Sequence, residues 1–401
     1  MNISIGLELQ YTKSKRYMSE WKEYKLGDLT IDGKGCYGIA APAVEYDVNK
    51  YTYLRITDIN DDGTINKNGL KSVDNKNASN YLLKPNDIVF ARTGASVGRS
   101  YFYDVRDGEL VYAGFLIKYS LDPTKVNPKL LKFYTHSQPY YDWIQTVDNG
   151  ATRGNINAQT YASMPVMLPD RNKQDEIVSI LSSLDDKIDL LNRENTTFEA
   201  MAETLFRQWF IEEAKEEWEE GKLGDICEYV KEKADITNID KNTYVTTENM
   251  RSNKQGVVPP SSVPENIKVT IYSPDDILLS NIRPYFKKLW LSDRNGGCSN
   301  DVLCIRSKNE VFKHLVYYTI RQDDFFDYVM LGSKGSKMPR GDKQHIMNWP
   351  IQMPPYPHIK RFNDLVADCI EKMQSNNRQV QCLQAQRDIL LPKLMSNEIA
   401  I

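Results

Sequence analysis

The sequence predicts an α+β protein in which one α/β module occurs twice in tandem, and each copy is followed by a long helix. Three observations support this fold class: a short phrase that occurs twice, a set of turn residues that recurs behind it, and two stretches with a regular apolar period. The 401 residues are 41% hydrophobic and 26% charged, so the chain contains enough apolar residues for more than one packed core.

The repeated phrase opens each module. WKEYKLGDL begins at Trp21, and WEEGKLGDI begins at Trp218. Behind it, LKPNDIVFAR in the first copy corresponds to YSPDDILLSN in the second, and both predict a turn that leads into a buried strand. Near the end of each module, Pro165 recurs as Pro350 at a spacing of 185 residues. The chain is therefore expected to contain two copies of one structural frame.

Short strands and turns are expected in most of each module, because β-branched and aromatic runs alternate there with Gly, Pro, Asn and Asp. Two stretches without such breakers, 130–147 and 312–330, predict helices.

A long helix follows each module, because apolar residues recur there at alternating steps of four and three. A period of 3.5 residues indicates left-handed coiling against a partner helix, and we expect the two long helices of the chain to pair as an antiparallel coiled coil. The seam positions are Ile177, Leu181, Leu184, Ile188, Leu191, Asn195, Phe198, Ala202, Leu205 and Trp209, then Phe362, Val366, Cys369, Met373, Asn376, Val380, Leu383, Arg387, Leu390 and Leu394.

Each seam contains one asparagine. In a fully overlapped antiparallel pair, Asn195 falls opposite Asn376. A buried amide pair would penalise slipped registers, in which an Asn faces an apolar side chain. The sequence alone leaves open whether these residues set the register or are polar breaks near solvent.

The expected organisation follows from these patterns. Because the copies are joined head to tail and their helices pair antiparallel, we expect the modules to be related by an approximate twofold axis. No apolar run is long enough to cross a membrane and the start has no signal-peptide pattern, so the expected location is the cytoplasm. The predicted boundaries are 1–17 for an N-terminal extension of uncertain role, 18–170 for the first module, 171–213 for the central helix, 214–356 for the second module and 357–401 for the C-terminal helix.

The sequence gives little support for a catalytic or metal-binding motif. The glycines of 33–38 fit a phosphate-binding pattern, but Pro42 would stop the helix that such a loop requires, so we expect a flexible glycine loop. Asp170 and the Asp-Asp-Lys at 185–187 imitate a nuclease pattern, but the latter lies within the central helix. The sequence contains neither the aromatic tetrapeptide of amino-methyltransferases nor a P-loop. The six cysteines form no C-x-x-C pair and are expected to be buried thiols. We predict no catalytic residue, metal ligand or cofactor on this chain.

Four clusters of polar and basic residues have chemistry suited to DNA. Arg and Lys match guanine edges and phosphates, Asn matches adenine, and nearby glycines allow close approach. Each cluster alone is also compatible with a solvated loop, and the net charge of −3 is low for a protein that grips nucleic acid unaided. The candidates in the first module are Arg92, Thr93, Ser96, Arg99, Thr152, Arg153, Asn155 and Asn157. Those in the second are Asn281, Arg283, Tyr285, Lys287, Lys288, Lys334, Ser336, Lys337, Arg340 and Lys343.

The ordered phrases of the two halves resemble the specificity subunit of a type I restriction and modification system. The resemblance rests on WKEYKLGDL with YLRITDINDDGTI, then MPVMLP, then the heptad helix from QDEIVSIL to FRQWF, and finally ILLPKLMSNEI. It covers 19–401 and leaves the first residues outside the pattern.

This resemblance implies a non-catalytic DNA-binding subunit. Each module would be a target recognition domain that reads one half of a bipartite DNA site. The helices would act as a spacer and dock two adenine methyltransferase subunits, to which restriction subunits bind. S-adenosylmethionine, ATP and Mg would then be cofactors of those partner subunits in DNA methylation and bacterial defence.

Two other classes of protein remain as alternatives. A self-sufficient methyltransferase or nuclease would need a base pocket, a cofactor loop or a metal site. A coiled-coil scaffold unrelated to DNA would need only the helices, and it would leave the Arg, Asn and Lys loops without a role. Sequence-independent methylation by the assembled complex would exclude the specificity hypothesis.

Overall fold

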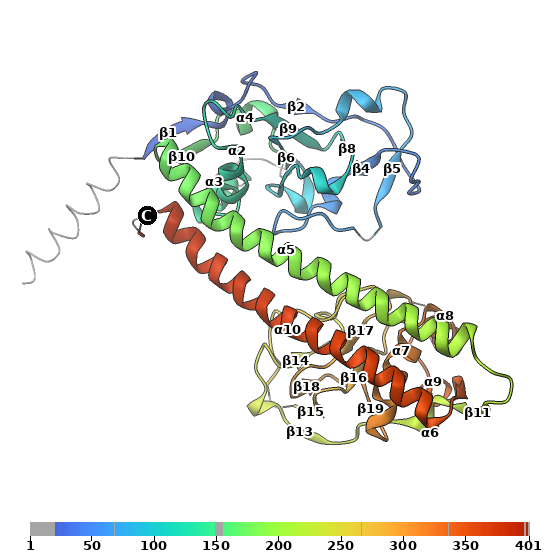
Figure 1. Ribbon diagram of the computed structural model, residues 1–401. Helices are drawn as coiled ribbons and strands as arrows, with labels where there is room; N and C mark the ends of the chain where they lie inside the picture. Colours follow the sequence, from blue (N-terminus) through green and yellow to red (C-terminus); the bar gives the residue numbers. More distant parts are fainter. Residues whose placement is uncertain are drawn as a thin grey trace, which may run out of the picture. The chain divides into compact units, whose positions relative to one another are not determined.

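The computed structural model describes residues 21–67, 69–148, 155–265, 267–335, 337–396 and 398–399. The chain divides into two compact units (Figure 1). Unit 1 comprises Met1–Asp189 and Gln381–Ile401, and unit 2 comprises Leu190–Val380. The predicted extension at 1–17 lies outside the described residues.

Unit 1 is built around a sheet of order β2-β9-β6-β7 and a second sheet of order β3-β5-β4-β8. Helices and the second sheet lie on opposite faces of the first sheet. The strands are β2 (Cys36–Tyr37), β3 (Ala43–Val44), β4 (Thr52–Leu54), β5 (Lys71–Val73), β6 (Asp87–Ala91), β7 (Ser100–Phe102), β8 (Leu110–Tyr112) and β9 (Leu116–Ser120). The helices are α2 (Pro128–Tyr134), α3 (Gln138–Asp148) and α4 (Ala158–Ala162).

The central strand β6 is buried on both faces. All five of its residues are buried, and the four that follow Asp87 are apolar. Ile88 and Phe90 pack with the helices of unit 1, whereas Val89 and Ala91 pack with residues of the second sheet. Because both faces of the strand are covered, the alternation expected of a half-exposed strand is absent. The predicted turn and buried strand in PNDIVFAR are confirmed.

Unit 2 repeats the first sheet in the order β12-β19-β16-β17. Its second sheet has the order β13-β15-β18-β14. The last two strands of this order are parallel, as are β4 and β8 in unit 1, but the third place is taken by β18 in unit 2 and by β4 in unit 1. The strands are β12 (Cys227–Tyr229), β13 (Lys233–Asp235), β14 (Tyr244–Val245), β15 (Lys268–Tyr272), β16 (Ile277–Ser280), β17 (Leu289–Leu291), β18 (Gly296–Cys298) and β19 (Val302–Ser307). The helices are α6 (Leu223–Ile226), α7 (Lys313–Arg321), α8 (Asp323–Leu331) and α9 (Lys343–Met347).

The repeated opening phrase forms the same structure twice. Its first residues form β1 (Lys22–Lys25), which pairs antiparallel with β10 (Pro165–Leu168). In unit 2, β11 (Glu219–Lys222) pairs in the same way with β20 (Pro350–Met353). The Asp of each LGD sequence is the third residue of the helical turn that follows the strand, and its carboxylate accepts a hydrogen bond from the N-cap backbone N–H three residues earlier. The phrase therefore joins the start of each module to its end.

Two predicted helices prove to be helix pairs. The stretch 130–147 is interrupted between α2 and α3, and 312–330 is interrupted at Gln322, whose backbone is extended. In the first case the Thr135 hydroxyl donates to Lys132 O at 3.0 Å and the Ser137 hydroxyl donates to Tyr134 O at 2.7 Å. These bonds satisfy carbonyls at the end of α2 and allow the chain to turn.

Two smaller predictions are wrong. Cys36 and Cys382 are exposed thiols, although Cys227, Cys298 and Cys304 are buried as expected. The glycine run is not a loose loop either, because two of its three glycines, Gly35 and Gly38, are closely packed. A Cβ on the glycine at position 35 would lie 2.6 Å from the Tyr119 ring, and one at position 38 would lie 2.2 Å from a backbone oxygen.

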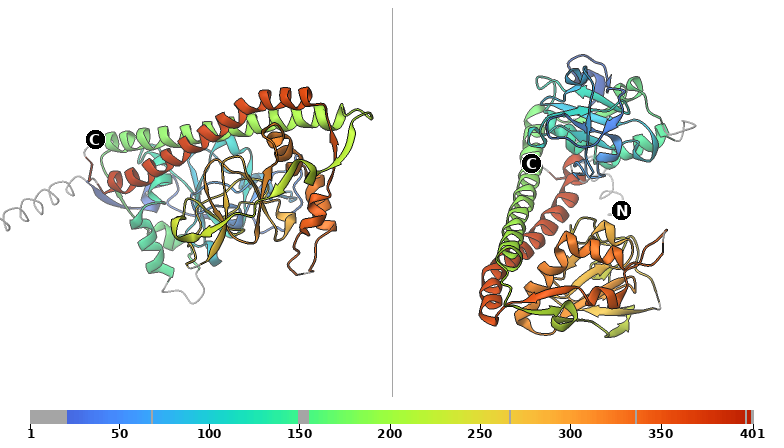
Figure 2. Two further views of the ribbon diagram at one scale, coloured as in Figure 1. Left: turned by 90° about the horizontal axis from the view of Figure 1, so that it is seen from below. Right: turned by 90° about the vertical axis from the view of Figure 1, so that its right-hand side faces the viewer.

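The two long helices are α5 (Arg171–Arg207) and α10 (Tyr356–Met395), which lie side by side in Figures 1 and 2. A π-helical turn, Gln208–Glu212, follows α5. None of the predicted seam residues is exposed. Within unit 2 the pairing is antiparallel, since Asn195 contacts Asn376 and Phe206 contacts Phe362. None of the described helices is long and apolar enough to cross a membrane.

The predicted amide pair is present in unit 2. Asn376 is 0% exposed, and its Nδ2 donates to Asn195 Oδ1 at 3.0 Å and to Glu194 Oε2 at 3.0 Å. Asn195 in turn donates to Asn377 Oδ1 at 2.8 Å. No described residue donates to Asn376 Oδ1, so one acceptor of the buried amide is unsatisfied. That this pair sets the register stays a prediction.

Replacing both amides should stabilise the helix pair. The double change Asn195→Leu and Asn376→Leu removes both polar groups from the seam, and we expect it to raise the free energy of unfolding by about 1 kcal/mol. The single change Asn376→Leu leaves Asn195 Oδ1 without the donor that Asn376 supplies and should give a less stable protein than the double change. Guanidinium denaturation of the three proteins measures these differences, and equal stability of the single and double variants would contradict the proposed coupling.

Candidate DNA interface

The two predicted clusters of unit 1 meet where β6 ends. Ile156 N donates to Arg92 O at 2.9 Å, and Thr93 forms a β-bridge with Asn155. The loop after β6 is thereby joined to the segment before α4. We call residues 92–99 and 155–157 loop pair 1. Thr152 and Arg153, which were predicted with this cluster, lie outside the described residues.

The two predicted clusters of unit 2 meet in the same manner at the end of β16. Gly341 N donates to Asn281 O at 3.1 Å, and Ile282 forms a β-bridge with Arg340. A second bridge joins Arg340 to Lys334. We call residues 281–288 and 334–343 loop pair 2; Ser336 lies outside the described residues. The four clusters of the sequence therefore form two sites, one in each unit, at the end of the equivalent strand.

Some candidates of loop pair 1 have structural partners within the protein. Arg99 Nε donates to Asp61 at 2.7 Å, and the same guanidinium donates to Ile59 O at 3.1 Å. The Ser96 side chain is buried, being 8% exposed. Asn157 caps α4 by accepting a hydrogen bond from Thr160 N at 2.9 Å. These side chains hold the loops in shape, and any contact that they make with DNA stays a prediction.

Arg92 has a different setting. Its guanidinium lies over the Tyr37 ring, 4.9 Å from the ring centroid, and no described residue accepts a hydrogen bond from its Nε. Tyr37 is 42% exposed, and its hydroxyl accepts a hydrogen bond from Ala158 N at 3.1 Å. The ring thus holds the guanidinium of Arg92 through a cation–π contact. The sequence analysis did not select Tyr37, although this residue lies within the glycine run at 33–38.

Three of the seven cations of loop pair 2 are paired with carboxylates. Lys287 lies 3.0 Å from Asp323, Lys334 lies 2.8 Å from Asp342, and Arg340 lies 3.0 Å from Asp301. The hydrogen bond from Lys334, with backbone N–H groups at the start of α9, lowers the pKa of Asp342 to about 2. Loop pair 2 therefore has fewer unpaired cations than its sequence suggests.

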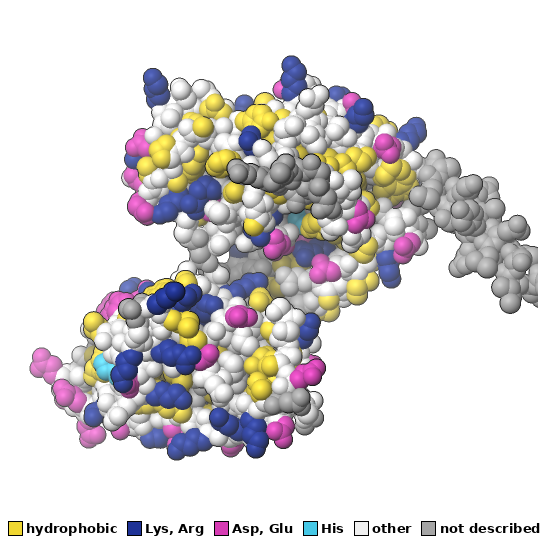
Figure 3. Space-filling model, turned by 180° about the vertical axis from the view of Figure 1, so that it is seen from behind, with side chains coloured by type: hydrophobic (Ala, Val, Ile, Leu, Met, Phe, Trp, Pro, Cys, Tyr) yellow, Lys and Arg dark blue, Asp and Glu magenta, His cyan; other side chains and the backbone are white. Residues whose placement is uncertain are grey.

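Other side chains of loop pair 2 differ in burial. Lys288 Nζ donates to Thr247 O at 2.5 Å, and burial lowers the pKa of this lysine. Lys343 lies over the Tyr229 ring at 5.6 Å. Arg283, Tyr285 and Lys337 are exposed, and no described carboxylate forms an ion pair with Arg283 or Lys337. On the face of unit 2 in view in Figure 3, Lys and Arg side chains are grouped, with Asp and Glu mostly toward its edge.

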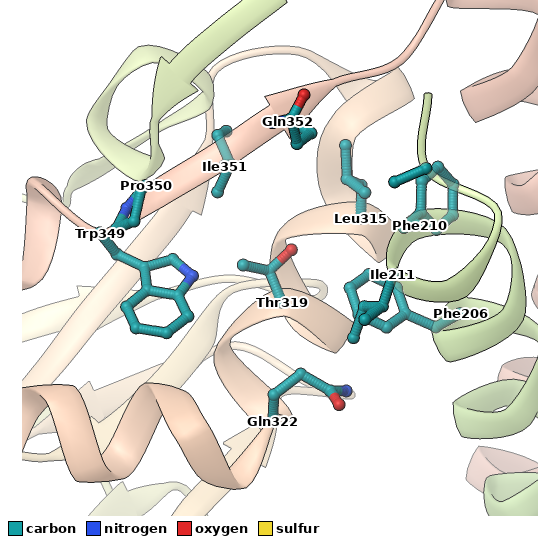
Figure 4. A pocket seen from close by; sticks show the side chains of 11 residues that line it. Phe206, Phe210, Ile211, Leu315, Thr319, Gln322, Trp349, Pro350, Ile351 and Gln352 are labelled. Atoms are coloured by element: carbon teal, nitrogen blue, oxygen red, sulfur yellow. The ribbon is translucent and has the colours of Figure 1, made fainter. Parts of the chain in front are cut away.

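Unit 2 also contains an apolar pocket of about 290 Å³ between the end of α5, α7 and β20 (Figure 4). No side chain that lines it is an acid or a base, so the pocket offers no proton-transfer group. Elsewhere, no three described His, Cys, Asp or Glu side chains are grouped so that they could hold a metal ion. The lining residues are Phe206, Phe210, Ile211, Ala214, Leu315, Thr319, Gln322, Trp349, Pro350, Ile351 and Gln352.

One residue that lines this pocket is smaller than its counterpart in unit 1. Position 319 corresponds to Tyr134 of unit 1 at the spacing of 185 residues, because α2 and α7 begin at that same spacing. The Tyr134 hydroxyl donates to Pro165 O at 2.7 Å, and the residue equivalent to Pro165 is Pro350. Thr319 has a smaller side chain than Tyr134 and lines the pocket together with Pro350.

Comparison with known proteins identifies the family to which the chain belongs. The family model described as type I restriction modification DNA specificity domain matches residues 18–200 and 215–380. The chain belongs to this family. The two matched ranges each contain one module and at least part of the long helix that follows it, as expected for tandem specificity domains of a family whose role is DNA target specificity.

Individual relatives cover parts of the chain. It is 25% identical over 297 residues to the type I restriction enzyme MjaIX specificity subunit of Methanocaldococcus jannaschii, a match that covers 65% of this chain and 66% of that protein. It is 29% identical over 209 residues to the HindI specificity subunit of Haemophilus influenzae, covering 49% of this chain and 42% of the relative. The matches thus span less than two thirds of these relatives. The crystal structure of a type I restriction-modification system S subunit from M. genitalium has the same fold, with a TM-score of 0.53 and 13% identity over 93% of this chain and 96% of that one.

Filling the pocket should stabilise unit 2. In the variant Thr319→Tyr the new ring can occupy the pocket and its hydroxyl can reach Pro350 O, as Tyr134 reaches Pro165 O. We expect the free energy of unfolding to rise by about 1 kcal/mol, seen as a higher melting temperature. The matched change in unit 1, Tyr134→Thr, should lower it by about 2 kcal/mol or more. A lower melting temperature for Thr319→Tyr would show that the pocket cannot accept the ring.

Proposed function

We propose that this chain is the non-catalytic specificity subunit of a type I restriction-modification complex and that it reads a bipartite DNA target. In this proposal loop pair 1 reads one half of the target and loop pair 2 reads the other. One observation carries the proposal: both units join two variable loops by the same hydrogen bond, from Ile156 N to Arg92 O and from Gly341 N to Asn281 O. A shared frame with different side chains suits two different half-sites.

The proposed partners are two adenine methyltransferase subunits and the restriction subunits of the complex. These partners would bind S-adenosylmethionine, ATP and Mg, and they would methylate or cleave the DNA that this subunit selects. The charge of the chain supports this division of labour. Its formal net charge is −3, and three cations of loop pair 2 are already paired with carboxylates. Partner subunits would therefore have to supply much of the phosphate contact.

The decisive test is the methylation pattern of the reconstituted complex. The full chain is expressed with its methyltransferase partner in a host that lacks other adenine methylation, and the genome is sequenced by a method that detects N6-methyladenine. The expected result is methylation at one sequence with two specified parts and an unspecified spacer. Methylation without sequence preference, as a scaffold would produce, overturns the proposal.

Truncation of Arg92 should affect one half of the target. The variant Arg92→Ala removes a guanidinium from loop pair 1, and we expect a 10-fold to 100-fold loss of affinity for the cognate duplex, corresponding to about 1–3 kcal/mol. Methylation should become less selective in one half-site only. The control Lys76→Ala removes a charge from an exposed position of unit 1 outside the loop pair and should leave selectivity unchanged. Equal effects on both half-sites would contradict the assignment of one half-site to each loop pair.

A further inference from the structure

One turn of loop pair 2 has an unusual backbone. Arg283 has a φ of 50° and Lys287 has a φ of 50°, and they lie on either side of the short 3₁₀ helix Pro284–Phe286. Residues other than glycine rarely adopt this left-handed backbone conformation, because their Cβ then approaches the following carbonyl oxygen. Such residues persist where the surrounding structure holds them, and they are concentrated at functional sites.

The equivalent turn of unit 1 has the same corners but uses glycine at both. Counting from the shared Pro-x-Asp-Ile sequence, Arg283 corresponds to Gly94 and Lys287 corresponds to Gly98. These glycines have φ values of 70° and 85°, so the backbone is of the same kind in both units. A Cβ at Gly94 would meet nothing within 4 Å, which shows that this corner faces open space. Glycine is the unstrained choice, and unit 2 departs from it at both corners.

The turn of unit 2 is held in place by a neighbouring loop. Asn253 N donates to Phe286 O at 2.9 Å, and Lys254 N donates to Lys287 O at 2.8 Å. The amino groups of Lys254 and Lys287 lie 2.9 Å and 3.0 Å from one carboxylate, that of Asp323. These contacts offset the backbone strain and give the turn a defined orientation.

The turn at 283–287 exposes a pair of adjacent aromatic rings. Tyr285 is 48% exposed and Phe286 is 38% exposed, and their ring centroids lie 4.7 Å apart at an angle of 53°. At the equivalent positions of unit 1, Ser96 is buried and Val97 is half-buried. Two adjacent exposed rings in a loop beside an unpaired Arg283 are unfavourable in water but suited to contact with stacked bases.

We propose that Tyr285 and Phe286 form a wedge that inserts between stacked base pairs of the half-site read by unit 2 and kinks the DNA there. Arg283, at the exposed corner next to the rings, then contacts a backbone phosphate. The proposal rests on the proposed function, because it requires that loop pair 2 bind DNA. Apolar and aromatic side chains that enter a base step partly unstack it and bend the duplex. Unit 1 has no such wedge at the equivalent turn, so only one half-site is deformed.

This asymmetry has a consequence for specificity. A deformed step favours sequences that unstack easily, such as pyrimidine–purine steps, even where no side chain contacts the base edges. The half-site of unit 2 should therefore include a preference of this kind within its recognised sequence.

The test uses the full complex with its methyltransferase and the duplex found by methylation sequencing. The fluorescent adenine analogue 2-aminopurine, which brightens when it is unstacked, replaces each adenine of either strand in turn except the methylated adenines, because a methyltransferase extrudes its target base. The expected result is increased fluorescence at one step in one half-site. The variant Tyr285→Ala with Phe286→Ala should abolish this signal and reduce affinity at least 10-fold, whereas the ring-retaining Tyr285→Phe should preserve both.

Two controls separate the possible outcomes. Tyr46→Ala removes an exposed ring of unit 1, where Tyr46 is 52% exposed, and should leave the signal unchanged. The melting temperature of the double alanine variant shows whether it folds. If the wild-type complex methylates one bipartite sequence without any brightened step, or if the signal survives the double alanine change, the wedge proposal is overturned while the proposed function stands. If methylation has no sequence preference, the proposed function itself fails.

Discussion

Burial of the apolar seam on α5 and α10 supplies part of the core of each unit, and it does so with residues from distant parts of the chain. In unit 1, Ile177 and Leu181 of α5 share a core with Leu391 and Leu394 of α10. In unit 2, Phe206 joins Phe362 and the helices of the second module in the same manner. An isolated helix of this length would leave its seam in water, so each module depends on both helices to complete its core.

The core of each unit is complete without most of the side chains of its loop pair. β6 and β16 are buried along their whole lengths, and each ends at the edge where its loop pair begins. The backbone hydrogen bond that joins the two loops of each pair involves no side chain, so side chains there can change without loss of the junction. The backbone of the loop pair can therefore stay the same while its side chains differ. One fold thus holds Arg92 against a tyrosine ring in unit 1 and exposes a pair of aromatic rings in unit 2.

Features that depend on local period could be predicted from the sequence, and those that depend on tertiary contact could not. The seam follows from spacing alone, and the contact between Asn195 and Asn376 follows from spacing once the helices are taken to be antiparallel and fully overlapped. The order of the sheets does not, because the strands are short and strands that pair are mostly not consecutive in the sequence. The pairing of candidate cations was equally hidden, since Arg99 and Lys287 meet carboxylates at Asp61 and Asp323, far from them in sequence. The strained corner at Arg283 could have been suspected, because the repeat aligns it with Gly94.

The shared core also has a consequence for biosynthesis. The residues at 391–395 that complete unit 1 leave the ribosome after the whole of unit 2 has been made. At typical rates of elongation, the roughly 210 residues between Leu181 and Leu391 take about 10 to 40 seconds to translate. During that interval the seam of the nascent first module has no partner from α10. The first domain to be synthesised is thus the last to close, and it is the one that chaperones and proteases encounter unfinished.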